Sequence, residues 1–482
     1  MTARLCTATL ERLPAAVRRP HYDRSAIECG IVHIGPGAFH RVHQAWYAEQ
    51  WLATDRRWGI AGVSLRSGAL RDALAAQDGL YTLAIVDQSQ AFEVIGSLRE
   101  VLVAADDPAA ALQRVARPEA RLLTLTVTEK GYCLDVDGHL DLAHPDIRLD
   151  LQHPRQPRSA IGYVVEGLRL RRERGLPPLP VMSCDNLAGN GHLLSAAVRG
   201  LAGAVDPSLA AWIAAEVTFP CTMVDSITPA TTPELRARVA AATGLEDAWP
   251  VQREAFVQWV VEEHRAVQGP DWAAAGVVVT NDVAGYERAK LRLLNGAHST
   301  LAYVGLLRGH ATVGEAMQDG ALLAVVRELM LEDVAPTLRP VRGLDVPGYV
   351  EAVLNRFRNP VIRHELAQIA WDGSKKLPVR ILGTVRDALA AGRPLDRLCL
   401  PLAAWMHFVR RRAAAGVPLV DPLSARLEEL ARTGTDGRAQ ADVAAFLALE
   451  DVFARDLAAS APFRAALVKA YGRLGTAGAP LT

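Results

Sequence analysis

The chain of 482 residues lacks several features that would assign it to a special class of proteins. Its six cysteines contain no C-x-x-C pair and show no disulfide-framework spacing, which predicts free thiols in a reducing compartment. Lysine plus arginine balances aspartate plus glutamate at 53 each, so no overall charge attracts nucleic acid or an anionic membrane. No apolar run approaches the ~20 residues of a membrane span, and the first residues lack the apolar core of a signal peptide. We therefore expect a cytoplasmic protein with neither nucleic-acid nor membrane partners.

The order of strand and helix signals in the first half of the chain indicates a parallel sheet. An apolar run at Ile31–Ile34 is followed by a glycine turn, a helical stretch at Phe39–Leu52 and a second apolar run at Gly59–Leu65. This order is typical of a right-handed βαβ unit. Further predicted strands are Tyr81–Val86, Ala91–Ile95, Leu122–Thr128, Pro180–Cys184 and Val277–Thr280, with helices at Ile161–Glu173 and His192–Leu201 and a loop at Asp135–Asp150.

The character of the sequence changes near Gly285. Strand signals stop there, and helical patterns rich in Ala, Leu and Arg continue to the end. We therefore predict an α/β fold with two domains. Residues 1–285 form an N-terminal Rossmann-type domain with a mostly parallel sheet, and residues 286–482 form a mainly α-helical domain that binds substrate and carries catalysis.

The glycine turn is the first candidate functional motif. Gly35-Pro36-Gly37 stands between the first predicted strand and the helix that begins near Ala38 and Phe39. Glycines there permit a tight turn and close approach of a pyrophosphate to the backbone and the helix N-terminus. His40 occupies the place of the third glycine of G-x-G-x-x-G. The turn predicts a dinucleotide site formed by Gly35, Gly37, Ala38 and Phe39.

The end of the second predicted strand lacks the acidic residue that usually holds the adenosine ribose. Ser64-Leu65-Arg66-Ser67 stands there instead. Arg66 is a candidate for binding a 2′-phosphate or for stacking on adenine, and a plain surface arginine is an equal alternative. The choice between NAD and NADP therefore stays open.

A second candidate motif lies between residues 286 and 298. If this stretch is a regular α-helix, Glu287, Lys290, Asn295 and His298 lie on one side of it, together with leucines. A mixed Lys, Asn, His and Leu stripe is unusual both for a core and for a solvated surface. Oxidation of a carbinol carbon needs a base for the hydroxyl proton and neutral donors for the developing alkoxide, and lysine and asparagine supply these.

A third motif follows the predicted strand at Pro180–Cys184. Asn186 lies at the carboxyl edge of the sheet, where open α/β folds bind ligands, and is either a second oxyanion donor or a turn residue. We predict no metal, because His364-Glu365 lacks the second histidine of H-E-x-x-H. The Asp- and His-rich stretch between residues 135 and 144 is interpreted as a polar loop.

Together these motifs resemble the polyol-specific long-chain dehydrogenases, the family of mannitol 2-dehydrogenase and fructuronate reductase. The resemblance covers nearly the whole chain. The strings that carry it are residues 35–41 (GPGAFHR), 128–132 (TEKGY), 183–186 (SCDN), 219–225 (FPCTMVD), 290–298 and 372–378 (DGSKKLP).

The resemblance implies a dinucleotide-binding domain, a helical domain and an active site with residues from both. It assigns the general base to Lys290, the oxyanion pair to Asn186 and Asn295, and contacts with substrate hydroxyls to His298. Its remaining assignments are Asp225 and Lys376 for substrate binding and Glu287 for a proton relay. In one departure from the family signature, Ser226 stands where an arginine follows the aspartate.

These observations favour a metal-independent oxidoreductase that interconverts a hexitol such as mannitol and its 2-ketose, with NAD as the cofactor and NADP as the alternative. A fructuronate reductase is the rival reading, in which Arg363, Lys375 or Lys376 binds the carboxylate of the uronate. A nucleotide-binding sensor without catalysis is the third. The expected partner is a small polyol, ketose or sugar acid, and the expected assembly is a monomer or a small homo-oligomer.

Overall fold

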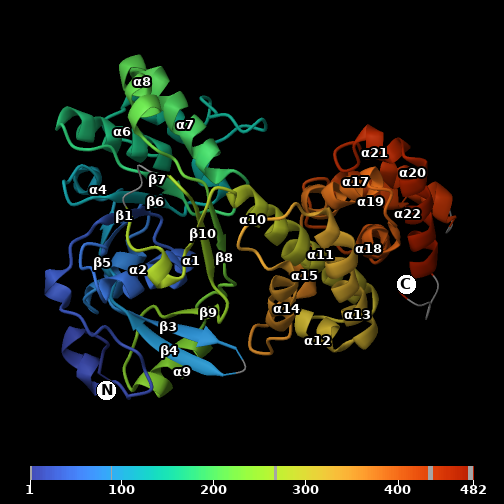
Figure 1. Ribbon diagram of the computed structural model, residues 1–482, viewed down its shortest axis with the longest axis horizontal. Coiled ribbons are helices and arrows are strands. Elements are labelled where there is room, and N and C mark those ends of the chain that lie inside the picture. Colours follow the sequence, from blue (N-terminus) through green and yellow to red (C-terminus); the bar gives the residue numbers. More distant parts are fainter. Residues whose placement is uncertain (1–2, 88, 265–268, 433–437, 476–480, 482) are drawn as a thin grey trace. The chain divides into compact units, whose positions relative to one another are not determined.

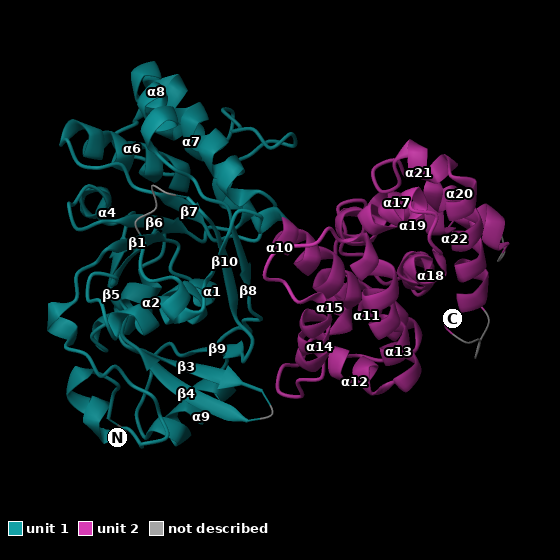
Figure 2. Ribbon diagram, viewed as in Figure 1, with its two compact units in different colours: residues 1–284 teal, residues 285–482 magenta. Residues whose placement is uncertain are grey.

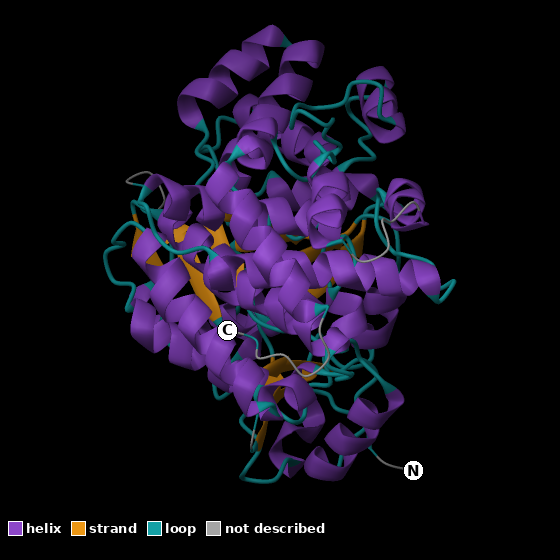
Figure 3. Cartoon of the chain, turned by 90° about the vertical axis from the view of Figure 1, so that its right-hand side faces the viewer, coloured by secondary structure: helices purple, strands orange, loops and turns teal. Residues whose placement is uncertain are grey.

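The computed structural model describes residues 3–87, 89–264, 269–432, 438–475 and 481. The chain divides into unit 1, residues 1–284, and unit 2, residues 285–482 (Figure 2). Helices predominate over strands in the chain as a whole (Figure 3).

The central sheet of unit 1 has five strands in the order β5-β2-β1-β6-β7, and every neighbouring pair is parallel (Figure 1). Four of these strands are short apolar runs that are buried almost throughout, as expected of a parallel sheet covered on both faces, and the edge strand β5 is half-buried and contains Arg99 and Glu100. The predicted Rossmann-type domain is therefore confirmed. The strands are β1 Ile31–Ile34, β2 Ile60–Ser64, β5 Leu98–Val103, β6 Leu122–Leu125 and β7 Val181–Ser183.

The helix predicted at Phe39–Leu52 is two helices. α1 (Ala38–Val42) ends at His43, whose φ of −114° and ψ of −90° lie outside the helical region, and α2 (Gln44–Leu52) begins directly after it. The loop prediction for Asp135–Asp150 was wrong at its end, because His144 caps the helix α5 (Pro145–Gln152). The other helices of unit 1 are α3 Ala69–Ala75, α4 Pro108–Val115, α6 Ala160–Glu173, α7 Asn190–Val205, α8 Pro207–Glu216 and α9 Pro233–Thr243, with 3₁₀ turns η1 Thr7–Arg12, η2 Arg24–Ala26, η3 Glu129–Tyr132 and η4 Ala273–Ala275.

Two smaller sheets complete unit 1, in the orders β4-β3-β9 and β11-β10-β8. Both contain an antiparallel pair, β3 with β4 and β8 with β10. Sequence analysis missed β5, β8, β9 and β10, because polar and charged residues interrupt their apolar pattern. The strands of these two sheets are β3 Tyr81–Val86, β4 Gln90–Ile95, β8 Thr222–Asp225, β9 Val251–Glu254, β10 Gln258–Glu262 and β11 Val278–Thr280.

Unit 2 is helical, and its described residues form no strand element. The long helix α18 (Asp396–Ala414) packs against α11 (Gly296–Leu307) and α22 (Ala461–Leu474) at the centre of the unit. Three segments are π-helical: η5 Lys290–Asn295, η6 Leu329–Val334 and η8 Pro378–Leu382. The remaining helices are α10 Val283–Ala289, α12 Val313–Gln318, α13 Gly320–Glu328, α14 Val346–Phe357, α15 Leu366–Ile369, α16 Gly373–Leu377, α17 Gly383–Ala390, α19 Ser424–Arg432, α20 Ala439–Leu447 and α21 Arg455–Ala459, with a 3₁₀ turn η7 Ala335–Thr337.

Among the described residues, no helix combines the length and the apolar character that a membrane span requires.

Candidate functional site

Of the two glycines in the turn after β1, the backbone conformation and packing require only the first. Gly35 has a φ of +91°, and a Cβ there would lie 2.2 Å from the carbonyl oxygen of Thr126, so the fold itself requires glycine. Gly37 has a φ of −71°, and the nearest atom to a Cβ there would be 3.9 Å away. Nothing in the described protein requires a glycine at residue 37. The space beside it is open to a ligand.

A pocket of about 570 Å³ opens beside this turn, within unit 1. Its wall contains three cations, Arg41, Arg66 and Lys130, and none of its lining residues is acidic. A pocket with this charge suits the phosphates of a dinucleotide. The lining residues are Gly35, Pro36, Gly37, Ala38, Arg41, Ser64, Leu65, Arg66, Ser67, Leu70, Thr126, Val127, Thr128, Lys130, Gly131 and Trp249.

Four of the five predicted cofactor residues line this pocket, and Phe39 does not. The Phe39 ring stacks instead on His43, with centroids 5.1 Å apart, and packs against the core of the unit. Sequence analysis missed Arg41, Lys130 and Trp249. Lys130 belongs to the TEKGY string and Arg41 to the glycine-turn string, so position in a motif was an available signal for both.

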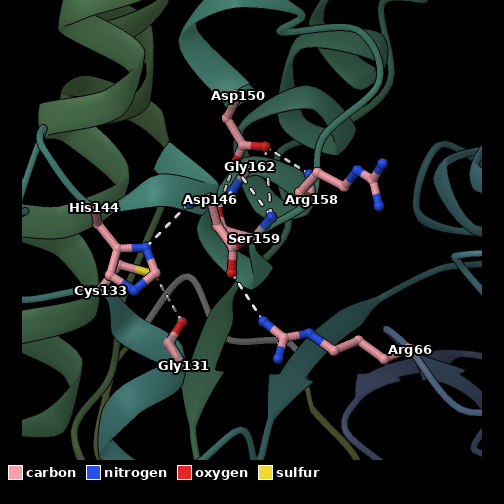
Figure 4. A network of polar contacts seen from close by, with 9 residues as sticks. All are labelled: Arg66, Gly131, Cys133, His144, Asp146, Asp150, Arg158, Ser159 and Gly162. Atoms are coloured by element: carbon pink, nitrogen blue, oxygen red, sulfur yellow. Dashed lines mark hydrogen bonds and ion pairs between the residues drawn. The ribbon is translucent and has the colours of Figure 1, made fainter. Parts of the chain in front are cut away.

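Arg66 forms an ion pair at the rim of the pocket. Its Nη2 lies 2.8 Å from Oδ2 of Asp146, which comes from α5 (Figure 4). The Arg66 side chain is 79% exposed, so the pair contributes little to stability. The backbone N–H of Asp146 donates to Nδ1 of His144 at 3.2 Å, which fixes the first turn of α5. The only carboxylate bonded to Arg66 among the described residues therefore stands outside the pocket wall.

Two stacked histidines lie behind the turn. The rings of His33 and His40 are 3.5 Å apart, and both side chains are fully buried. The ring nitrogens of His33 lie 2.7 Å from Thr124 Oγ1 and 2.8 Å from Thr126 Oγ1. Burial lowers the pKa of His33 to about 3 and the pKa of His40 well below its usual value, so both rings are neutral. His40 thus fills the place of the third glycine as a packing residue.

The carboxyl ends of β6 and β7 are joined by Asp185. Its carboxylate accepts hydrogen bonds from the N–H groups of Val127 and Thr128, both at 2.9 Å, and from the Tyr132 hydroxyl at 2.8 Å. Burial raises the pKa of Asp185, and these donors oppose the shift. Asn186 follows directly and is exposed. The structure therefore fixes the backbone on which the predicted oxyanion donor stands.

A second polar anchor ties β7 to β8. The buried Asn190 amide donates to the carbonyl oxygens of Ser183 and Thr222, and its Oδ1 accepts from the Thr222 N–H at 2.9 Å. Asp225, a predicted substrate residue, is the last residue of β8 and is buried. Ser226, which replaces the family arginine, donates to the carbonyl oxygen of Phe256 at 3.0 Å.

The predicted catalytic helix of unit 2 is not a regular α-helix. Lys290–Asn295 is the π-helix η5, between α10 and α11. The i→i+5 hydrogen bonds of a π-helix place Asn295 close to one turn above Lys290, whereas a regular α-helix would rotate it well away. The expectation of a regular α-helix over these residues was therefore wrong. The observed geometry brings these two side chains closer to one face, and π-helical segments are frequent at functional sites.

His298 and Ser299 extend this face along α11. They lie three and four residues after Asn295, the spacing of neighbours on a helix surface. The His298 ring packs against Phe357, with centroids 4.4 Å apart, and lies 6.0 Å from the ring of His364. The Oδ1 atom of Asn295 is buried and accepts no hydrogen bond from the described residues. A buried acceptor without a hydrogen bond lowers the stability of the fold, unless a bound ligand donates a hydrogen bond to it.

A second π-helix packs against this face. η8 follows α16 directly and contacts η5 and α11. Lys376, on α16, donates from Nζ to the carbonyl oxygen of Ile369 at 3.3 Å, and burial followed by the charge of Arg380 lowers its pKa. By contrast, Arg363 is 75% exposed and pairs with Glu365 at 2.8 Å. Lys376 therefore lies just before η8, the segment that packs on η5, whereas Arg363 is exposed and bonded to a carboxylate.

The comparisons with known proteins extend over both units. The family model described as "Mannitol dehydrogenase Rossmann domain" matches residues 29–274, and "Mannitol dehydrogenase C-terminal domain" matches residues 282–475. The chain belongs to the mannitol dehydrogenase family. It is therefore an oxidoreductase, and the family resemblance stated from the sequence motifs is confirmed.

Individual relatives match along nearly the whole chain. The D-mannonate oxidoreductase of Escherichia coli (strain K12) is 43% identical over 98% of this chain and 99% of its own. The mannitol 2-dehydrogenase of Pseudomonas fluorescens, solved with NAD and D-mannitol, is 37% identical, with a TM-score of 0.82 over 99% of this chain and 98% of its own. A substrate-free D-sorbitol dehydrogenase is 35% identical, with a TM-score of 0.91 over 100% of this chain and 99% of its own.

The acidic and histidine-rich stretch near residue 140 has local structural roles. Asp135 accepts from the N–H groups of Asp137 and His139, and Asp141 accepts from that of Ala143. Within the described part of the chain, no three His, Cys, Asp or Glu side chains are grouped as metal ligands would be.

Proposed function

We propose that this mannitol dehydrogenase family member is an NAD(P)-dependent enzyme that interconverts a secondary alcohol and a ketone in an open-chain, six-carbon sugar derivative. The observation that carries the proposal is the pocket beside the glycine turn. It combines three cations, no lining carboxylate and an open space next to Gly37. A bound nicotinamide supplies the hydride acceptor or donor, which no protein side chain can supply.

Lys290 is the proposed general base. In the direction of oxidation its neutral amine takes the hydroxyl proton from the substrate, and Glu287, one helical turn before it, relays that proton to solvent. Asn295 and Asn186 donate amide hydrogens to the alkoxide oxygen that forms. His298, Asp225 and Lys376 bind the other polar groups of the substrate. The π-helical position of Asn295 relative to Lys290 supports this division of roles.

NAD is the proposed cofactor, and NADP is its rival. The wall of the pocket offers no carboxylate for a ribose 2′-hydroxyl and places Arg66 and Ser67 at the end of β2. Arg66 and Ser67 could bind the 2′-phosphate of NADP. The Asp146 carboxylate, which is paired with Arg66, would repel that phosphate and so favours NAD. Titration of the protein with each reduced cofactor, followed by fluorescence, measures the preference directly.

Two substrate pairs are the candidates. Mannitol and its 2-ketose are the first, as the name of the solved Pseudomonas enzyme suggests. Mannonate and fructuronate are the second, because the relative named D-mannonate oxidoreductase is 43% identical over almost the full length. Absorbance of reduced cofactor, followed with D-mannitol, D-sorbitol and D-mannonate and with NAD or NADP, tests both pairs. A chain that binds the cofactor and oxidises none of these would instead be a nucleotide-binding sensor.

A further inference from the structure

Arg380 carries a positive charge that no described carboxylate neutralises. It lies on η8 and is half-buried. Its one hydrogen bond with a described residue runs from Nη1 to Oγ of Ser299, at 3.2 Å. Burial lowers the pKa of Arg380, and Tyr303 alone opposes that shift. Partial burial of a guanidinium without a paired anion is unfavourable, so the presence of an arginine at this position needs a functional explanation.

Three other partly buried arginines of unit 2 are paired with carboxylates. Arg292 bonds Asp387 at 2.5 Å, and Arg397 bonds three acidic residues of the segment at 328–333. Arg410 bonds the buried Asp442 at 2.7 Å. Arg380 differs from these three arginines, because no described carboxylate is bonded to it.

The location of Arg380 connects it to the proposed catalytic face. Its partner Ser299 lies four residues after Asn295 and directly after His298, so the guanidinium is held beside that face. Lys376 lies one helical turn before Arg380, and after burial the charge of Arg380 lowers the pKa of Lys376. Two positive charges therefore lie close together, and neither Lys376 nor Arg380 has a hydrogen bond to a described carboxylate.

We propose that Arg380 binds the carboxylate of the substrate, which makes a hexonate, and not an uncharged hexitol, the preferred substrate class. A guanidinium pairs with a carboxylate through two parallel hydrogen bonds, and an uncharged terminal hydroxymethyl group cannot replace that pairing. This inference rests on the proposed function, because it takes Asn295 and His298 as residues of the substrate site. It replaces Arg363, which is exposed and paired with Glu365.

The test compares D-mannonate with D-mannitol in the full-length enzyme. We expect Arg380→Met to raise KM for D-mannonate by roughly 100-fold and to change kcat/KM for D-mannitol by less than about 5-fold. Arg380→Lys keeps the charge but loses the bidentate geometry, so its KM for D-mannonate should lie between those of the wild type and Arg380→Met. Arg386→Gln, which removes an exposed arginine from the same unit, should change the kinetics with neither substrate.

The outcomes separate the two proposals. An equal loss of activity on both substrates in Arg380→Met would show that Arg380 supports the fold and does not bind the carboxylate. A wild type that prefers D-mannitol would also overturn the role of Arg380 in carboxylate binding. In either case the proposed oxidoreductase function would stand. A wild type that oxidises neither substrate with either cofactor would contradict the proposed function itself. Calorimetric titration with D-mannonate then tests Arg380 separately: binding that Arg380→Met weakens supports its role, and no difference between the two proteins overturns it. Thermal melting of each variant identifies any that fail to fold.

Discussion

Units 1 and 2 hold their polar functional residues by different means. In unit 1 the ladder of parallel strands fixes the backbone, and the half-buried Asp185 and the buried Asn190 hold the strand ends by hydrogen bonds. In unit 2 there is no such ladder among the described residues, and the candidate catalytic face depends on where the regular helix is interrupted by η5 and η8. A sheet therefore positions groups by register between strands, whereas a helical unit positions them by local changes of helical pitch.

The largest effect should follow from removing the base in unit 2. Lys290→Ala is expected to lower kcat by about 10²–10⁴-fold, because the variant lacks the amine that is proposed to take the hydroxyl proton. Cofactor binding by unit 1 should be unchanged. Steady-state kinetics and a fluorescence titration of the cofactor measure both, and Lys375→Ala, an exposed neighbour of Lys376, is the control. Full activity in Lys290→Ala would rule out the proposed base.

The same substitution at the two turn glycines of unit 1 should have different effects on stability and on cofactor binding. Gly35→Ala should destabilise the protein by about 3 kcal/mol, because the Cβ meets the Thr126 carbonyl oxygen and the backbone has a positive φ. Gly37→Ala should cost less than about 1 kcal/mol of stability but weaken cofactor binding about 10-fold. Thermal denaturation and cofactor titration give the two values. A Gly37→Ala protein that binds the cofactor normally would show that the open space is not its site.

Acid should destabilise the protein through the buried histidines of unit 1. The pKa of His33 is lowered from 6.5 to about 3 in the folded protein. Between these two pH values His33 is therefore protonated in the unfolded chain and neutral in the folded chain. This contribution to stability is complete above about pH 6.5 and is lost as the pH falls toward 3, by about 2 kcal/mol between pH 7 and pH 5. Urea denaturation at both pH values measures it. His33→Asn should show a smaller difference between the two pH values, and an unchanged difference would contradict the assignment.

The smallest effect concerns the cofactor preference at the rim of the pocket. Asp146→Asn releases Arg66 from its ion pair and should shift the ratio of kcat/KM values toward NADP by about 3- to 10-fold. Arg66→Gln should shift the ratio the other way. The exposed Asp72 pairs with Arg71 elsewhere on unit 1, so Asp72→Asn is the matched control. No change in either direction would exclude Arg66 from the 2′ position of the ribose.

Several features of unit 1 could be predicted because they depend on short stretches of sequence. The apolar run of β1, the turn after it and β3 were placed to within one residue, since burial on both faces demands uninterrupted apolar residues. The strands β9 and β10 were missed because polar residues interrupt their apolar pattern. Arg253 of β9, for example, is buried with its guanidinium over the ring of Trp46, more than 200 positions away. The split at His43 was also missed, since that residue bonds the carbonyl oxygen of Gln258, more than 200 positions away.

The sequence by itself determined the family, the parallel sheet, the glycine turn and the residue types of the candidate catalytic set, because periodicity and motif strings are local properties of the chain. Only the tertiary structure decided that Lys290 and Asn295 belong to a π-helix, that the pocket beside the glycine turn is cationic, and that no described carboxylate is bonded to Arg380. The physical reason is that helical pitch, burial and charge pairing depend on which segments pack together. Residues far apart in the sequence supply those partners, and no local pattern encodes them.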